Sequence, residues 1–173
     1  KELIDMGAEV YCLTQELNKD SIFKKENLDQ KTTLIYGNIL DSNLINISLK
    51  KHDIDTVFHL AAQPLVQLAL NKPFETIETN VTGTLNILEN CRLNGTKRIL
   101  IASSDKAYGS QENLPYNEAH SMNGLYPYDV SKSCADLIAQ MYGRVYKMPI
   151  VITRCANVFG PGDVNMNRII PSI

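Results

Sequence analysis

Short apolar segments alternate with longer helical patterns along the chain, and this alternation constrains the fold more than any other feature. Five segments are rich in β-branched or aromatic residues and are bounded by polar residues or glycine, which predicts strands. They are residues 8–14, 33–37, 53–61, 97–102 and 149–154. Their continuous apolar runs are typical of parallel strands buried on both faces. The order of elements therefore predicts an α/β fold with a doubly wound parallel sheet.

Three helical patterns lie between these strands, at residues 41–51, 74–93 and 127–146. Asp41 suits the N-cap of the first helix, and Pro127 suits the first position of the third. Asn94-Gly95 is a C-terminal signal for the second helix. On the second and third helices, apolar residues recur at helical spacing and are assigned to core packing. These residues are Ile77, Val81, Leu85 and Leu88, and then Cys134, Ile138, Met141 and Val145.

Composition argues against several functional classes. The 173 residues suggest one domain, and 17 basic against 19 acidic residues give a net charge of −2. That balance argues against a nucleic-acid or anionic-membrane partner, and no apolar run reaches the roughly 18 residues of a membrane span. The four cysteines form no CxxC pair and the three histidines stand apart, so we expect no metal site and a cytoplasmic protein with reduced thiols.

Three polar residues suggest chemistry at one edge of the predicted sheet. Tyr128 and Lys132 are four residues apart on a predicted helix, so their side chains share a face. A neighbouring ammonium group favours the phenolate form of a tyrosine, which could then act as a base. Ser104 follows the strand at 97–102, and ligands of open α/β sheets bind at the carboxyl ends of strands. The pattern predicts that the Ser104 hydroxyl holds a substrate hydroxyl beside the Tyr128 oxygen.

Six motifs occur in a consistent order along almost the whole chain. They are GNILD (37–41), VFHLAAQ (57–63), TNVTGTLNILE (79–89), SSDKAYG (103–109), YPYDVSK (126–132) and TRCANVFGPGD (153–163). Together they resemble the extended short-chain dehydrogenases/reductases of the nucleotide-sugar epimerase/dehydratase group. The SDK triplet and the AAQ loop are most similar to the 4,6-dehydratases, particularly the CDP-glucose type, rather than the 4-epimerases.

The resemblance implies a Rossmann-like domain that binds NAD, with NADP still open because Thr14 and Gln15 stand where an acidic residue is expected. Glu16 is the nearest carboxylate for the ribose 2′-hydroxyl. The implied cofactor contacts are Glu16, Asn38, Ile39, Leu60, Ala61, Ala62, Gln63, Tyr128, Lys132 and Cys155. The implied substrate contacts are Ser104, Asn157 and Arg168.

The resemblance also implies a reaction on a nucleotide-sugar. Tyr128 would be the base at the C4 hydroxyl, and Asp105 would be the general acid that releases the C6 hydroxyl as water. Lys106 stands where the family often has a glutamate base, so it would act as a neutral amine or would orient groups and stabilise the enolate. A 4-epimerase would need Ser104, Tyr128 and Lys132 without the acid, and a non-catalytic nucleotide-binding relative or inactive fragment is a further alternative. The family often forms homodimers through the helix that contains Tyr128.

The largest departure from the family pattern is at the two ends. The first strand and its glycine-rich phosphate loop are not found, and neither is the C-terminal part that completes the sugar-nucleotide pocket. We therefore expect residues 1–173 to be a partial NAD(P)-binding Rossmann domain that is inactive alone. In the common strand order the missing strand would lie between those at 8–14 and 53–61, which predicts a gap in the sheet.

Overall fold

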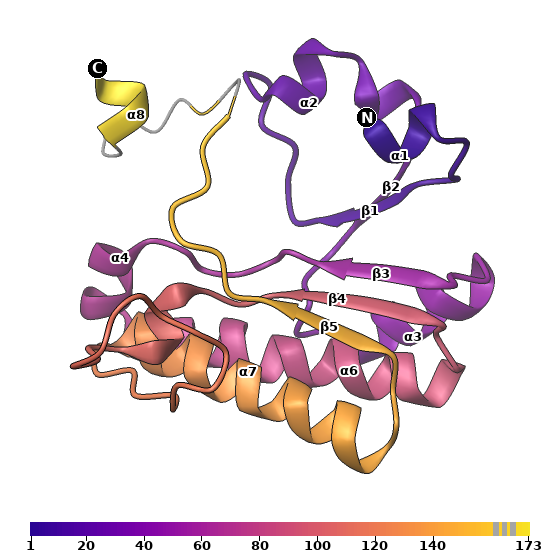
Figure 1. The fold of residues 1–173 in the computed structure, drawn as a ribbon. Coiled ribbons are helices and arrows are strands. Elements are labelled where there is room, and N and C mark those ends of the chain that lie inside the picture. Colours follow the sequence, from indigo (N-terminus) through magenta and orange to yellow (C-terminus); the bar gives the residue numbers. More distant parts are fainter. Residues whose placement is uncertain (161–162, 164–165, 167–168) are drawn as a thin grey trace. The chain divides into compact units, whose positions relative to one another are not determined.

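The computed structural model describes residues 1–160, 163, 166 and 169–173 (Figure 1). The chain divides into two compact units. The first unit consists of Lys1–Asn38 and Asn157–Ile173, and the second unit consists of Ile39–Ala156. Most of the predicted site residues lie in the second unit.

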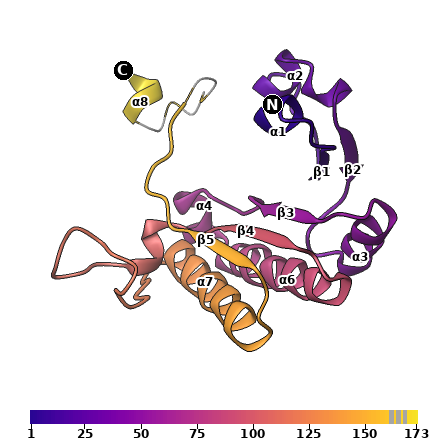
Figure 2. The same ribbon diagram turned by 45° about the vertical axis from the view of Figure 1, so that its right-hand side comes forward.

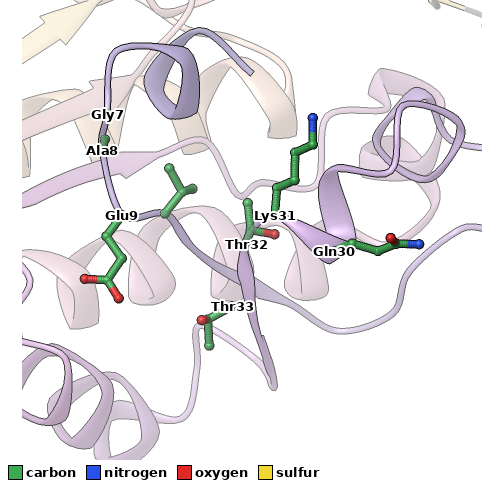
Figure 3. A pocket seen from close by; sticks show the side chains of 8 residues that line it. Gly7, Ala8, Glu9, Gln30, Lys31, Thr32 and Thr33 are labelled. Atoms are coloured by element: carbon green, nitrogen blue, oxygen red, sulfur yellow. The ribbon is translucent and has the colours of Figure 1, made fainter.

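The first unit is built around one pair of parallel strands. Strands β1 (Tyr11–Thr14) and β2 (Thr33–Tyr36) pair in parallel, with Tyr11 opposite Thr33. The helical elements of this unit are α1 (Glu2–Asp5), α2 (Ile22–Lys25), η1 (Leu28–Gln30) and α8 (Ile169–Ser172). A hollow of about 500 Å³ lies where the two strands begin, lined by residues 7–10 and 30–33 (Figure 3). It is thus at the amino ends of these strands and not at the carboxyl ends, where α/β sheets bind ligands.

The second unit is a three-stranded parallel sheet with helices packed on it. Strands β3 (Thr56–His59), β4 (Arg98–Ala102) and β5 (Ile150–Thr153) lie in the order β3-β4-β5. The long helices α6 (Gly83–Asn94) and α7 (Pro127–Val145) run side by side along one face of this sheet (Figures 1 and 2). The remaining helical elements are α3 (Ser42–Lys51), α4 (Val66–Asn71), α5 (Pro73–Ile77), the π-helical turn η2 (Glu78–Thr82) and the 3₁₀ turn η3 (Asp105–Tyr108).

All five predicted strands are present, each inside its predicted range. Their parallel pairing confirms the α/β, Rossmann-like class. They form two sheets and not one, β1-β2 and β3-β4-β5. One of these sheets belongs to each unit.

The predicted helix ends are confirmed. The Asp41 side chain caps α3 by accepting a hydrogen bond from the Leu44 amide at 2.9 Å. Pro127 occupies the first turn of α7. Gly95 ends α6 with a φ of +67°, a left-handed conformation that glycine adopts without steric cost.

The core assignment of the two apolar stripes is confirmed only in part: Leu88 is fully buried, whereas three of the eight predicted residues are exposed. On α7, Met141 and Val145 are exposed, whereas the buried face consists mainly of small and polar residues such as Ser131, Ala135 and Ala139. On the preceding helix, Leu85 is exposed while Asn80 and Thr84 are buried. The π-helical turn η2 adds a residue to one turn and so shifts the register between α5 and α6. Small residues also let helices approach the sheet closely, which leaves the larger apolar ones on the opposite face.

Neither a membrane-spanning helix nor a cluster of metal-ligating side chains occurs among the described residues. None of their helices combines the length and the apolar character needed to cross a bilayer. Within the same residues, no three His, Cys, Asp or Glu side chains gather as a cation site would require.

Candidate active site

The carboxyl end of β4 leads directly into the polar turn η3. Ser104, which is buried, caps this turn by accepting a hydrogen bond from the Lys106 amide at 3.2 Å. Its hydroxyl donates to Asp105 Oδ1 at 3.1 Å. The Asp105 amide donates to the Cys155 carbonyl at 3.1 Å, so η3 is also tied to the segment that follows β5. The predicted hydroxyl and the predicted acid therefore lie side by side.

Helix α7 presents the predicted base and its lysine on one face. Tyr128 and Lys132 are one turn apart, and Tyr128 is half-buried. The buried Lys132 ammonium donates to the carbonyl oxygen of Ala102 at 2.9 Å, and burial lowers the pKa of this lysine. Ala102, which accepts this hydrogen bond, is the last residue of β4, and Ser104 follows it by two positions in the sequence. The structure thus brings Lys132 and the Ser104 segment together.

A buried histidine lies near this ammonium. His59 Nε2 is 2.9 Å from Thr84 Oγ1, and that hydroxyl donates to the Asn80 carbonyl at 2.6 Å. Because a hydroxyl has a single proton, Thr84 must accept from His59, which assigns the Nε2-protonated tautomer. Burial, and then the charge of Lys132, lower the pKa of His59 to about 4. The ring is therefore neutral at pH 7 and adds no second positive charge beside Lys132.

One asparagine joins the loop after β3 to helix α7. The Asn80 side chain accepts from the Gln63 amide at 2.7 Å and donates to the Gln63 carbonyl at 3.2 Å. It also donates to Ser131 Oγ at 2.9 Å, and the Ser131 hydroxyl donates to the Tyr128 carbonyl at 2.6 Å. We call Asn80 with these partners the Asn80 clamp. It fixes the loop predicted to contact the cofactor relative to the helix that contains Tyr128.

The other predicted cofactor residues of the second unit differ in their exposure. Leu60 and Ala61 are exposed directly after β3, and Ala62 and Gln63 are half-buried. Ile39 is buried, and a Cβ atom at Gly83 would overlap its side chain, so glycine permits this packing. Cys155 is exposed after β5.

The predicted residues of the first unit are not placed against those of the second. Glu16 is exposed just beyond β1, and Asn38 is half-buried just beyond β2. Asn157 is exposed. Arg168 lies outside the described residues, so the roles of these four residues stay predictions.

The two residues that would distinguish a dehydratase lie in η3. Asp105 is half-buried and Lys106 is exposed.

The sequence prediction missed several buried polar residues of this region. They are His59, Asn80, Thr84, Tyr108, Asp136 and Arg154. Asn80 and Thr84 interrupt the apolar spacing of a predicted helix, and that interruption was the available signal. The sequence contains no such signal for Arg154 and Asp136, because the two residues pair across separate elements of the fold.

Comparisons with known proteins show the family of the chain. The model of the family described as GDP-mannose 4,6 dehydratase matches residues 1–173. A CDP-glucose 4,6-dehydratase from Salmonella typhimurium is 35% identical over 99% of this chain and 51% of its own length. The chain thus spans about half the length of that relative.

Two groups of solved structures resemble the fold. A dTDP-glucose 4,6-dehydratase from Streptomyces venezuelae, solved with NAD bound, has a TM-score of 0.85 and 28% identity, covering 99% of this chain and 55% of that one. A UDP-glucose 4-epimerase from Thermotoga maritima, solved with UDP-glucose, has a TM-score of 0.83 and 28% identity, covering 93% of this chain and 52% of that one.

Proposed function

The chain belongs to the GDP-mannose 4,6-dehydratase family, and we propose that the protein is an NAD-dependent nucleotide-sugar 4,6-dehydratase acting on a substrate of the CDP-glucose type. The observation that carries this proposal is the neighbourhood of Ser104, Asp105 and Lys132. Asp105 accepts a hydrogen bond from Ser104, and Lys132 is bonded to the last residue of the strand that precedes Ser104. An acid next to the serine of the proposed Ser104, Tyr128 and Lys132 set is what a dehydratase needs and an epimerase does not.

The residues present fit a nicotinamide cofactor at the carboxyl ends of β3 and β4. Within the described part of the chain, Lys132 donates to one protein acceptor, Ala102, and its other two N–H groups have no protein partner. They suit a ribose hydroxyl. The small side chains of Ala61 and Ala62 would let the backbone approach the cofactor closely. When bound, the nicotinamide would accept a hydride from the sugar C4 and return it to C6.

In the proposed reaction, Tyr128 as phenolate takes the proton of the C4 hydroxyl, and the positive charge of Lys132 stabilises that phenolate. The Ser104 hydroxyl orients the same C4 oxygen. The C4 ketone makes the C5 proton acidic, so a base can remove it. Asp105 then protonates the C6 oxygen as the C6–O bond breaks, and water leaves. Lys106 either takes the C5 proton as a neutral amine or stabilises the enolate as a cation.

A nucleotide-sugar 4-epimerase is the second candidate. It is favoured by the structural likeness to the Thermotoga maritima UDP-glucose 4-epimerase. That reaction would use Ser104, Tyr128 and Lys132 and would leave Asp105 without a catalytic role.

We also propose that the protein forms a homodimer through the outer faces of α6 and α7. Leu93, Leu137 and Val145 are exposed on these two helices, and Tyr146 is exposed directly after α7. Large apolar side chains gathered on neighbouring helices are typical of an interaction surface. Pairing of two such faces would form a bundle of four helices.

The experiment is turnover of CDP-, dTDP- and GDP-hexoses by the full-length protein with NAD. We expect a 4-keto-6-deoxy product from the wild type and none from Tyr128→Phe, because the phenol oxygen is lost. The matched control is Asp105→Asn, which should still exchange hydride at C4 while failing to release water. A product that differs only in the configuration at C4 would replace the dehydratase proposal with the epimerase.

A further inference from the structure

A buried ion pair links helix α7 to the segment after β5. The Arg154 guanidinium binds both carboxylate oxygens of Asp136, at 2.8 and 2.9 Å. Asp136 is fully buried and the Arg154 side chain is 14% exposed. Burial alone would raise the pKa of Asp136, but hydrogen bonds from Arg154 and Gln140 lower it below its ordinary value. This bidentate geometry is rigid and holds the guanidinium in one orientation.

The same guanidinium also binds the last residue of η3. Arg154 Nη1 donates to the Tyr108 hydroxyl at 2.9 Å, and the guanidinium carbon lies 5.1 Å from the centre of the Tyr108 ring. Tyr108 is buried, and it belongs to the same 3₁₀ turn as Asp105 and Lys106. Asp136 lies one helical turn beyond Lys132 on α7, on the face that also includes Tyr128. Asp136, Arg154 and Tyr108 therefore connect the two halves of the proposed catalytic site.

Neighbouring contacts stabilise this connection. Ser133 on α7 donates to the Ala107 carbonyl at 2.9 Å, which ties a second point of η3 to the same helix. The Tyr108 ring stacks on Tyr116, with centroids 5.2 Å apart and an interplanar angle of 22°. These contacts leave η3 few alternative positions once Arg154 is in place.

We propose that Tyr108 and Arg154 are positioning residues that hold Asp105 and Lys106 at the sugar C5 and C6 atoms, and that they act on the elimination of water and not on the hydride transfer at C4. The proposal rests on the dehydratase function proposed above. Tyr128 and Lys132 are held by α7 itself and by the Ala102 carbonyl, so they keep their places when the Tyr108 contact is lost. Asp105 and Lys106 lie on a short turn, and the contact of Tyr108 with Arg154 adds to the Asp105–Cys155 and Ser133–Ala107 hydrogen bonds that orient this turn.

The test compares two partial reactions in the full-length protein with NAD and CDP-glucose. Oxidation at C4 is followed by the absorbance of the reduced nicotinamide. Elimination is followed by solvent deuterium incorporated at C5 and by the 4-keto-6-deoxy product. The variants are Tyr108→Phe, which removes only the hydroxyl that binds Arg154, and the control Tyr116→Phe. The Tyr116 hydroxyl donates to the Gly109 carbonyl at 2.9 Å, in the same loop but away from Arg154.

We expect Tyr108→Phe to slow elimination by about tenfold or more, since small displacements of catalytic groups are costly, while C4 oxidation changes by less than about twofold. Reduced nicotinamide should then accumulate. Tyr116→Phe should change neither rate. Arg154→Lys should repeat the Tyr108→Phe pattern, because an ammonium cannot bind Asp136 in bidentate fashion and also reach Tyr108. If Tyr108→Phe does not fold, Arg154→Lys takes its place in the comparison of the elimination and C4-oxidation rates.

Two results would overturn the proposal. One is an unchanged ratio of the two rates in both Tyr108→Phe and Arg154→Lys. The other is an equal fall in both rates together with a lower unfolding temperature, which would indicate a purely structural role. A wild-type protein that oxidises C4 without forming a 4-keto-6-deoxy product would instead contradict the dehydratase function itself.

Discussion

Replacing Asn80 by alanine should destabilise the protein and free the loop after β3. Asn80 is 2% exposed, and its side chain makes the hydrogen bonds to Gln63 and Ser131 described above. The substitution removes the hydrogen-bond partner of the Gln63 amide, that of the Gln63 carbonyl and one partner of the Ser131 hydroxyl. At about 0.5–1.5 kcal/mol for each net hydrogen bond, the three together contribute about 3 kcal/mol. Gln63 is half-buried, so water can replace part of this lost hydrogen bonding in the variant.

The assay combines urea unfolding of the full-length protein with hydrogen exchange of the peptide that covers residues 60–65. The exchange measurement is local and reports directly on the Gln63 amide, which donates to Asn80. The matched control is Asn94→Ala, at the end of α6. Asn94 is half-buried and donates to Asn46 and to the Asn90 carbonyl, at 3.1 and 2.7 Å. Because solvent can replace these contacts, we expect a loss of only about 0.5–1 kcal/mol.

The reasoning fails if Asn80→Ala and Asn94→Ala destabilise the protein equally. It also fails if the exchange rate of residues 60–65 is unchanged in Asn80→Ala. Either result would mean that the Asn80 clamp does not hold this loop in solution. A faster exchange with weaker NAD binding would extend the role of the clamp to the cofactor.

Two further predictions concern titratable groups. The folded-state pKa of His59, about 4, lies below its ordinary value of 6.5. The unfolded chain therefore binds more protons between these values, and stability should fall as the pH decreases from 6.5 to 4. His59→Gln, which can still donate to Thr84, should flatten this part of a plot of urea midpoint against pH, and an unchanged slope would contradict the assignment. Burial raises the pKa of the Cys91 thiol to about 11, so iodoacetamide should label the exposed Cys155 in the native protein and leave Cys91 unmodified, as mass spectrometry of the labelled peptides would show. Labelling of Cys91 at a similar rate would contradict the described packing.

The local elements of the fold could be predicted because their determinants are local. The capping side chain of Asp41, the first-turn Pro127 and the left-handed Gly95 each act within a few residues of the helix end that they define. The five strands are short apolar runs, and the same few residues determine where each one begins and ends. The class of the fold followed from the order of these elements. The π-helical turn η2 was not predicted, since no residue type marks it.

The polar part of the site could be predicted only where it lies in one stretch of sequence. Tyr128 and Lys132 share a helix, and Ser104 and Asp105 are adjacent, so motifs show them directly. Asn80 and Ser131 are 51 residues apart, and Tyr108 and Arg154 are 46 residues apart. The first contact exists because η2 packs against α7, and the second because η3 and β5 both pack against α7. Periodicity within one segment contains no information about such pairs.

The error in the core assignment of α7 has a physical cause that also bears on assembly. The helix must place Lys132 against β4 and Asp136 against Arg154, so its sheet-facing side includes charged and small residues. Its larger apolar residues are consequently displaced to the opposite face, where Leu137 is 52% and Val145 is 63% exposed. The periodic apolar stripe therefore indicated an amphipathic helix correctly but wrongly assigned Met141 and Val145 to the core, whereas Cys134 and Ile138 of the same stripe are half-buried. An apolar outer face of this kind costs free energy in water unless another surface covers it, and the outer face of α6 and α7 from a second copy of the chain would do so.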